Sequence, residues 1–401
     1  MRRSAWHLRA GAVVMAWLVA AVSVSLVGLF QPVPHWLLVH LLLLGAVSNA
    51  ILVWSTHFAS ALLRLPDEHG RRGEVIRLGL FNTGALTVLA GMFTNHWVVV
   101  LTGGVAVAAT GVLHAFVLLR QMSRALPSRF GLTVRYYVAA GALLPIGVTF
   151  GVIMATGNLS ETTHAQFALA HVSVNMLGWM GLAVVGTLVT LWPTMLHTLV
   201  TDGAERAARR ALPVLATSLL GIAGGALVGS RVISVAGIIG YLVGLSIIGR
   251  PLVQEAIRRP PTTYATKSVL AGLLWLIGSV VALGIIVASA TDWSAADSAA
   301  AGLAAPLLVG FAAQVLLGAL SYLIPVVLGG GPSMARATIA ALDTAATARV
   351  TIINVGLLVG LLPLPSLART ICAALVLGAL VVFLPLVLRA VLLTRRPVIT
   401  A

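Results

Sequence analysis

Long apolar runs alternate with short polar segments along this chain, and the pattern predicts helices that cross a membrane. A bilayer core of roughly 30 Å needs about 20 apolar residues per helix. Twelve runs reach or approach that length, over residues 11–31, 36–63, 76–94, 97–120, 135–157, 164–192, 210–229, 232–251, 266–290, 302–329, 349–364 and 368–393. Helices are the open-chain structure that satisfies backbone groups in lipid, so we expect an all-α polytopic membrane protein with about 12 transmembrane helices.

The polar segments between the runs are short. The longest, such as 193–209 and 330–348, could not bury a hydrophobic core of their own. We therefore predict a single transmembrane helical domain over residues 1–401. Small residues, as in Gly221-Ile-Ala-Gly224-Gly225, let membrane helices pack closely, so the many glycines do not argue against helix.

Basic residues fall on one side of this twelve-span topology. Of the 25 Lys and Arg residues, all but Arg231 and Arg369 lie at the N-terminus, in the even-numbered loops or at the C-terminus. The positive-inside rule then places both termini in the cytoplasm, and we expect a bacterial cytoplasmic (inner) membrane. This topology accounts for the formal net charge of +15, so the expected partner is the lipid bilayer and not nucleic acid.

Composition narrows the classes of function. Apolar residues make up 59% of the chain and charged residues 9%, which excludes a soluble globular domain. The ten carboxylates all fall in loops or at span ends, and since an intramembrane carboxylate commonly marks an ion path, a proton- or sodium-coupled carrier is disfavoured. The chain also lacks P-loop, G-x-S-x-G and H-E-x-x-H patterns, so ATP hydrolysis, esterase and zincin chemistry have no support.

Histidines are the abundant ligating groups in the predicted spans. Neutral imidazole is the commonest metal ligand and also serves as an axial ligand of haem. An outer and an inner set can be distinguished: His35, His40, His96, His164 and His171 outside, His57 and His114 inside.

Depth favours one pair in the outer set. At 1.5 Å per residue, His40 lies about 6 Å below Trp36, and His171 about 10 Å below His164, so His40 and His171 lie at similar depths on two spans. We predict that these two are the principal haem or metal ligands. Asn175 shares a helix face with His171 and could hold the second nitrogen of its ring.

The remaining histidines are secondary candidates. His57 and His114 form a second candidate cofactor-binding pair near the inner boundary. His164 and His96 are further candidate metal ligands, although positions so close to the headgroups also suit a solvated interfacial role. For each histidine the alternative is a hydrogen bond that joins neighbouring helices.

Three segments carry a resemblance to a known family. They are His40-Leu-Leu-Leu-Leu-Gly45, His171-Val-Ser-Val-Asn175-Met-Leu-Gly178 and Gln314-Val-Leu-Leu-Gly-Ala-Leu-Ser321-Tyr322-Leu-Ile-Pro325. The first two resemble segments of the catalytic subunit I of haem-copper oxidases and nitric-oxide reductases, of which the NnrS family looks like a variant. The third is similar to membrane regions of actinobacterial copper-protein relatives, some of which are joined to cupredoxin domains.

The resemblance implies a haem-copper oxidase subunit I-like bundle that binds haem b or copper. It implies a redox, nitric-oxide or copper-related role and a cupredoxin-type or cytochrome redox partner. The oxidases carry further histidines on spans 7 and 10, whereas the runs 210–229 and 302–329 have none. We therefore expect a non-oxidase relative that lacks the binuclear centre and does not reduce oxygen or pump protons.

Two other classes of function stay open. A structural or assembly subunit of a respiratory complex would need no cofactor site. A transporter or permease would line its path with the intramembrane amides Asn49, Asn82, Asn175, Gln314 and Asn354.

Reporter fusions test the predicted topology. A fusion at the C-terminus and one after Pro127 should both report a cytoplasmic location, because the basic residues and the even number of spans place both positions there. A periplasmic signal at either position would contradict the twelve-span count.

Overall fold

The computed structural model is helical, and it describes residues 3–65, 71–126, 131–329 and 331–395. Within these ranges there are no strands, and twelve helices are long and apolar enough to cross a membrane. The predicted all-α class and the twelve apolar helices are therefore confirmed, and they are consistent with a polytopic membrane protein. The side of the membrane on which the termini lie stays a prediction.

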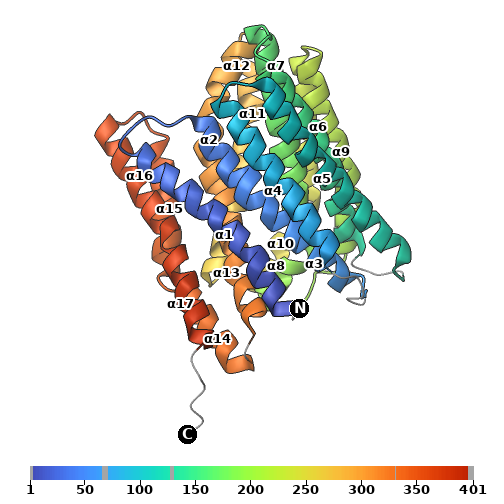
Figure 1. Cartoon of the computed structure of the whole chain (residues 1–401), viewed down its shortest axis with the longest axis vertical. Helices are drawn as coiled ribbons and strands as arrows, with labels where there is room; N and C mark the ends of the chain where they lie inside the picture. Colours follow the sequence, from blue (N-terminus) through green and yellow to red (C-terminus); the bar gives the residue numbers. More distant parts are fainter. Residues whose placement is uncertain (1–2, 66–70, 127–130, 330, 396–401) are drawn as a thin grey trace. The chain divides into compact units, whose positions relative to one another are not determined.

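Several spans are built from more than one helical element (Figure 1). The elements in chain order are α1 (Arg3–Gly28), α2 (His35–His40), η1 (Leu41–Val47), α3 (Ser48–Leu62), α4 (Arg72–Phe93), α5 (Trp97–Arg124), α6 (Gly131–Ala155), α7 (Glu161–Val172), η2 (Ser173–Leu182), α8 (Ala183–Met195), α9 (Ala204–Leu227), α10 (Arg231–Arg258), α11 (Tyr264–Ser289), α12 (Trp293–Ala300), η3 (Ala301–Leu303), η4 (Pro306–Ala313), α13 (Gln314–Leu328), α14 (Gly331–Leu342), α15 (Ala346–Gly360), α16 (Ser366–Val381) and α17 (Phe383–Arg395).

Two helices lie where the sequence predicted loops. Helix α14 fills most of the segment 330–348, with Pro332 in its first turn, where a missing N–H costs nothing. Helix α12 begins after Asp292, whose side chain accepts a hydrogen bond from the amide of Ala295 at 2.8 Å. The loop prediction was wrong at both places because short helices with polar first turns resemble loops in an otherwise apolar chain.

Three spans contain a π-helix, namely the second (η1), the sixth (η2) and the tenth (η4). The same three spans are the most buried: 56%, 72% and 67% of their apolar windows are buried, against at most 44% for any other span. Because π-helical turns are frequent at functional sites, these three spans are the leading candidates to carry a functional site.

The chain forms two compact units. Unit 1 comprises residues 1–50, 261–279 and 302–401, and unit 2 comprises residues 51–260 and 280–301.

In unit 1, indole rings pack against glycines of the π-helices. A Cβ on Gly45 of η1 would collide with the ring of Trp17 from α1. A Cβ on Gly310 of η4 would lie 2.6 Å from the ring of Trp275 from α11. The absence of a side chain at these two positions therefore lets a large ring lie directly on the widened backbone.

In unit 2, helices α9 and α10 approach closely through small residues. A Cβ on Gly225 would lie 2.5 Å from the amide nitrogen of Ser234, and one on Gly221 would lie 3.3 Å from the Cα of Gly237. The Ser234 hydroxyl donates to the carbonyl of Ile222 at 3.0 Å. The expected role of the small residues at 221–225 is confirmed for Gly221 and Gly225.

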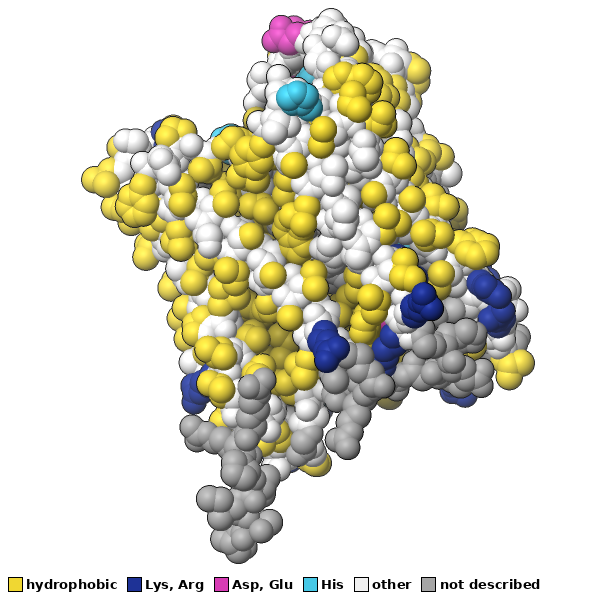
Figure 2. Space-filling model, in the orientation of Figure 1, with side chains coloured by type: hydrophobic (Ala, Val, Ile, Leu, Met, Phe, Trp, Pro, Cys, Tyr) yellow, Lys and Arg dark blue, Asp and Glu magenta, His cyan; other side chains and the backbone are white. Residues whose placement is uncertain are grey.

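The exposed surface of the helices is largely apolar, as Figure 2 shows for one face. Phe116, Ile285 and Leu375 are 58%, 62% and 57% exposed, and many other large apolar side chains are similarly exposed. A water-soluble monomer rarely shows such continuous apolar surface, whereas lipid chains cover it without cost.

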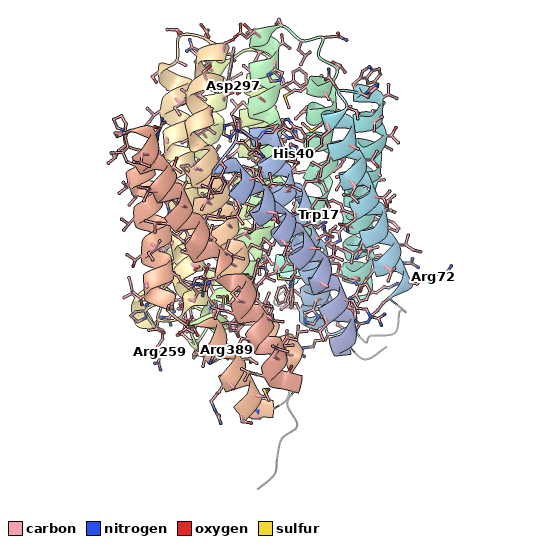
Figure 3. All side chains as sticks on the ribbon, turned by 60° about the vertical axis from the view of Figure 1, so that its left-hand side comes forward. Trp17, His40, Arg72, Arg259, Asp297 and Arg389 are labelled. Carbon is pink, nitrogen blue, oxygen red and sulfur yellow. The ribbon has the colours of Figure 1, made fainter. Side chains whose placement is uncertain are left out.

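Charges in each unit lie toward the helix ends (Figure 3). In unit 2, Arg72 and Arg259 lie at one end and Asp297 lies at the other. In unit 1, Arg389 lies near one end, whereas His40 lies toward the opposite end. Within each unit the basic residues at one end agree with the predicted charge asymmetry.

The contact between Trp17 and Gly45 should be sensitive to a single added methyl group. We expect Gly45→Ala to destabilise the protein by about 1–3 kcal/mol, as overpacking does in well-packed cores. The measurement is the apparent thermal midpoint in detergent. Gly11→Ala in α1 is the control, since a Cβ there meets nothing within 4 Å. An equal midpoint for both variants would contradict the tight packing.

Candidate functional site

His171 is held against helix α6 by a backbone hydrogen bond. Its Nδ1 lies 2.8 Å from the carbonyl oxygen of Gly147. Because a carbonyl only accepts, Nδ1 carries the proton and the lone pair of the ring lies on Nε2. A Cβ on Gly151 would lie 2.8 Å from Cε1 of His171 but 3.8 Å from Nε2. The edge of the ring that carries Nδ1 and Cε1 therefore lies closest to α6.

Asn175 lies beside His171, but its amide bonds mainly to the backbone. Its Nδ2 donates to the carbonyl of His171 at 2.9 Å and lies 3.3 Å from Nδ1 of the same residue. Since Nδ1 already donates its proton to Gly147, it offers no lone pair to the Asn175 amide. The Gly147 carbonyl thus holds the second ring nitrogen, and the Asn175 amide packs against the same edge of the ring.

Two glycines on α6 were missed by the sequence reasoning. A Cβ on Gly147 would collide with the Asn175 amide, and one on Gly151 would press on the His171 ring. Their spacing of four residues places both on one face of α6, and this spacing is the signal that could have identified them. Bare backbone on this face is what allows the imidazole and the amide to lie directly on α6.

His40 shows the same tautomer in unit 1. It ends α2, directly before η1, and its Nδ1 lies 2.6 Å from the carbonyl oxygen of Trp36. The proton therefore lies on Nδ1 and the lone pair on Nε2. The Trp36 ring packs edge-on, with 6.3 Å between ring centroids. Because His40 belongs to unit 1 and His171 to unit 2, their sharing of a cofactor stays a prediction.

His114 is buried in unit 2 with the opposite tautomer. Its Nε2 lies 2.9 Å from the Ser55 hydroxyl oxygen, and this hydroxyl donates to the carbonyl of Ile51 at 2.5 Å. Ser55 must then accept from Nε2–H, which leaves the lone pair on Nδ1. Among the described residues Nδ1 has no hydrogen-bond partner, and the edge of Trp179 packs against the ring at 6.2 Å.

His57 lies on a different side of α3 from Ser55, the residue that bonds to His114. Its ring packs edge-on against Trp54 of the same helix, with 5.7 Å between centroids. Ser55 and His57 are two positions apart and hence about 200° apart around the helix axis. The side of α3 that reaches His114 is therefore not the side that carries His57, and a cofactor shared by this pair stays a prediction.

The two outer candidates are exposed. His96 precedes α5, and its Nδ1 lies 2.6 Å from the carbonyl oxygen of Thr94. His164 lies in the first turn of α7, near enough to Asp297 for an electrostatic interaction. Within the described part of the chain, no group of three or more His, Cys, Asp or Glu side chains is arranged to hold a metal ion. An axial haem ligand does not require such a group.

Each of the predicted lining amides donates one hydrogen bond within its own helix. Each donates to the carbonyl four residues earlier, at 2.7 to 2.9 Å: Asn49 to Gly45, Asn82 to Leu78, Asn175 to His171, Gln314 to Gly310 and Asn354 to Val350. In unit 1, Gln314 and Asn354 also bond to each other, and the Asn354 oxygen accepts from the indole of Trp275 at 2.7 Å. Amides bonded in this way are less suited to lining a solvated path.

Comparisons with known proteins do not assign the chain to a family. No model of a known protein family matches the sequence. A search of curated proteins finds no match either. The function is therefore argued from the residues and their geometry.

The bond between Ser55 and His114 should contribute measurably to stability. Ser55→Ala would leave a buried imidazole N–H without a partner, so we expect a loss of about 1–3 kcal/mol in the free energy of unfolding. Ser60→Ala is the matched control, since that hydroxyl donates to Thr56 within the same helix. Adding His114→Leu to Ser55→Ala should cost less than the sum of the single changes, and strict additivity would argue against the bond.

Proposed function

We propose that this chain is an integral membrane protein that binds haem or copper through histidine. Its role would be redox, nitric-oxide or copper-related, and it would lack the oxidase binuclear centre. The observation that carries the proposal is the state of His171. Its Nδ1–H is fixed by a backbone carbonyl, as is usual for imidazoles that bind a metal through the other ring nitrogen.

The residues fit an imidazole-ligated group in a second respect. His40 has the same tautomer, and each of the two histidines stands immediately before or near the start of a π-helix in one of the most buried spans. When bound, haem or copper supplies one-electron chemistry. The protein orients the ring through Gly147 and packs it against bare backbone at Gly151.

The location of the resemblance supports the same proposal. The three segments that resemble oxidase subunit I and copper-protein membrane regions lie on spans 2, 6 and 10, which are also the spans with π-helices. An oxidase-like bundle, an NnrS-like relationship and a cupredoxin-type or cytochrome partner belong to this proposal. Because spans 7 and 10 carry no histidine, the proposed role is electron transfer, ligand binding or metal handling and not oxygen reduction.

A permease has less support. Each predicted lining residue donates one hydrogen bond to a backbone carbonyl of its own helix. In unit 1, Gln314, Asn354 and Trp275 also form a cluster of side chains that hydrogen-bond to one another. In a cofactor-free assembly subunit the bond from His171 to Gly147 would serve only to join α7 to α6.

Spectroscopy and metal analysis of the purified protein test the proposal. We expect a Soret band or bound copper in the wild type, and loss of that signal in His171→Ala and in His40→Ala, since each removes a ligand atom. His197→Asn is the control, because this exposed residue has a left-handed backbone that Asn tolerates.

Intermediate variants sharpen the test. Asn175→Ala and Gly151→Ala disturb the orientation of the ring but keep the ligand atom, so cofactor affinity should fall roughly 10–100-fold without being abolished. A colourless, copper-free wild-type protein would refute the proposal. Full cofactor retention in the double variant of His40 and His171 would refute the assignment of the ligands.

A further inference from the structure

Three polar side chains meet in the interior of unit 1, near the first turns of α11 and α15. Tyr264 and Ser268 are 0% exposed and Arg349 is 3% exposed. Tyr264 and Ser268 are four residues apart and share one face of α11. The guanidinium carbon of Arg349 lies 3.7 Å from the centre of the Tyr264 ring, so the cation is stacked on the phenol.

Each of the three side chains has a polar atom without a hydrogen-bond partner among the described residues. These atoms are Nη2 of Arg349 and the hydroxyl oxygens of Tyr264 and Ser268. Ser268 and Arg349 lie close enough to the Tyr264 hydroxyl to influence it, but neither meets hydrogen-bond geometry. Buried polar atoms are nearly always hydrogen-bonded, so three such atoms in one place indicate a ligand that bonds to all of them.

The charge of this cluster identifies the kind of ligand. Among the described residues, Arg349 donates to backbone carbonyls, from Nη1 to Leu342 at 3.2 Å and from Nε to Ala379 at 3.5 Å. The nearby carboxylate of Asp343 accepts from the backbone amide of Tyr264 and interacts with Arg349 electrostatically. A buried guanidinium is costly unless a negative charge compensates it. The positive ends of the α11 and α15 dipoles add to the positive potential.

We propose that Arg349, Tyr264 and Ser268 bind a small monovalent anion of the size of chloride. An anion accepts hydrogen bonds from all three groups at once and compensates the guanidinium. A water molecule would have to donate two protons where donors already predominate, and it carries no charge to add to that of Asp343. This site does not depend on the proposed cofactor, since it involves none of the candidate ligands.

Thermal unfolding of the full-length protein in detergent tests the proposal. We compare sodium chloride with sodium gluconate at equal ionic strength. The apparent midpoint should rise by about 2 °C or more in chloride and should saturate with chloride concentration, because binding to the folded state stabilises it. Equilibrium dialysis with radiolabelled chloride measures binding directly and should give saturable, stoichiometric retention.

Variants locate the site. Tyr264→Phe and Ser268→Ala each remove one donor and little else, so each should weaken chloride binding roughly 5–10-fold, as the loss of one hydrogen bond does. Ser279→Ala removes another buried hydroxyl of α11 and should leave binding unchanged. Identical melting curves in chloride and gluconate, with no retained chloride, would overturn the proposal. Equal weakening by all three variants would overturn the location.

Discussion

The rest of this structure depends on one constraint, that polar groups inside an apolar bundle must find partners within the protein. Helices meet this constraint for the backbone. Most side chains meet it in the same local way: hydroxyls and amides such as Ser25, Thr149 and Asn49 donate to the carbonyl four residues earlier. The side chains that reach another helix are therefore informative, because they join elements that are distant in sequence.

In unit 2 these long-range bonds surround the sixth span. Tyr241 donates to the carbonyl of Leu177 in η2 at 2.9 Å, and Tyr137 bonds to the hydroxyl of Thr187 at 2.8 Å. The His171 imidazole reaches Gly147. A helix whose hydrogen bonds run from residue i to i+5 has a wider turn than an α-helix, and η2 lies among these external bonds. The span that carries the candidate ligand is thus tied to its neighbours by several of these bonds.

Much of the fold follows from the sequence because the length of an apolar run is a direct physical requirement of the bilayer. The run 36–63 corresponds to a continuous span from His35 to Leu62. Histidines in such runs are conspicuous, and for that reason His40 and His171 could be selected. The Gly147 carbonyl could not be selected, because a backbone group leaves no mark in the sequence. Arg349 was counted as one basic residue of the topology, and its burial depends on tertiary contacts with Tyr264 and Ala379.

The π-helices have a consequence for how the second span can vary. A π-turn takes up one residue more than the α-helical turn that it replaces, so η1 sets the angular phase between His40 before it and Asn49 after it. Removal of one residue within 41–47 would favour an ordinary α-helix through the segment. The side chains that follow would then keep their faces relative to His40, because an α-helical turn completes the same rotation with one residue fewer. In an ordinary α-helix the loss of one residue turns every following side chain by about 100°. The segment η1 is therefore a place where the second span can lose one residue without reassigning the faces of the helix beyond it.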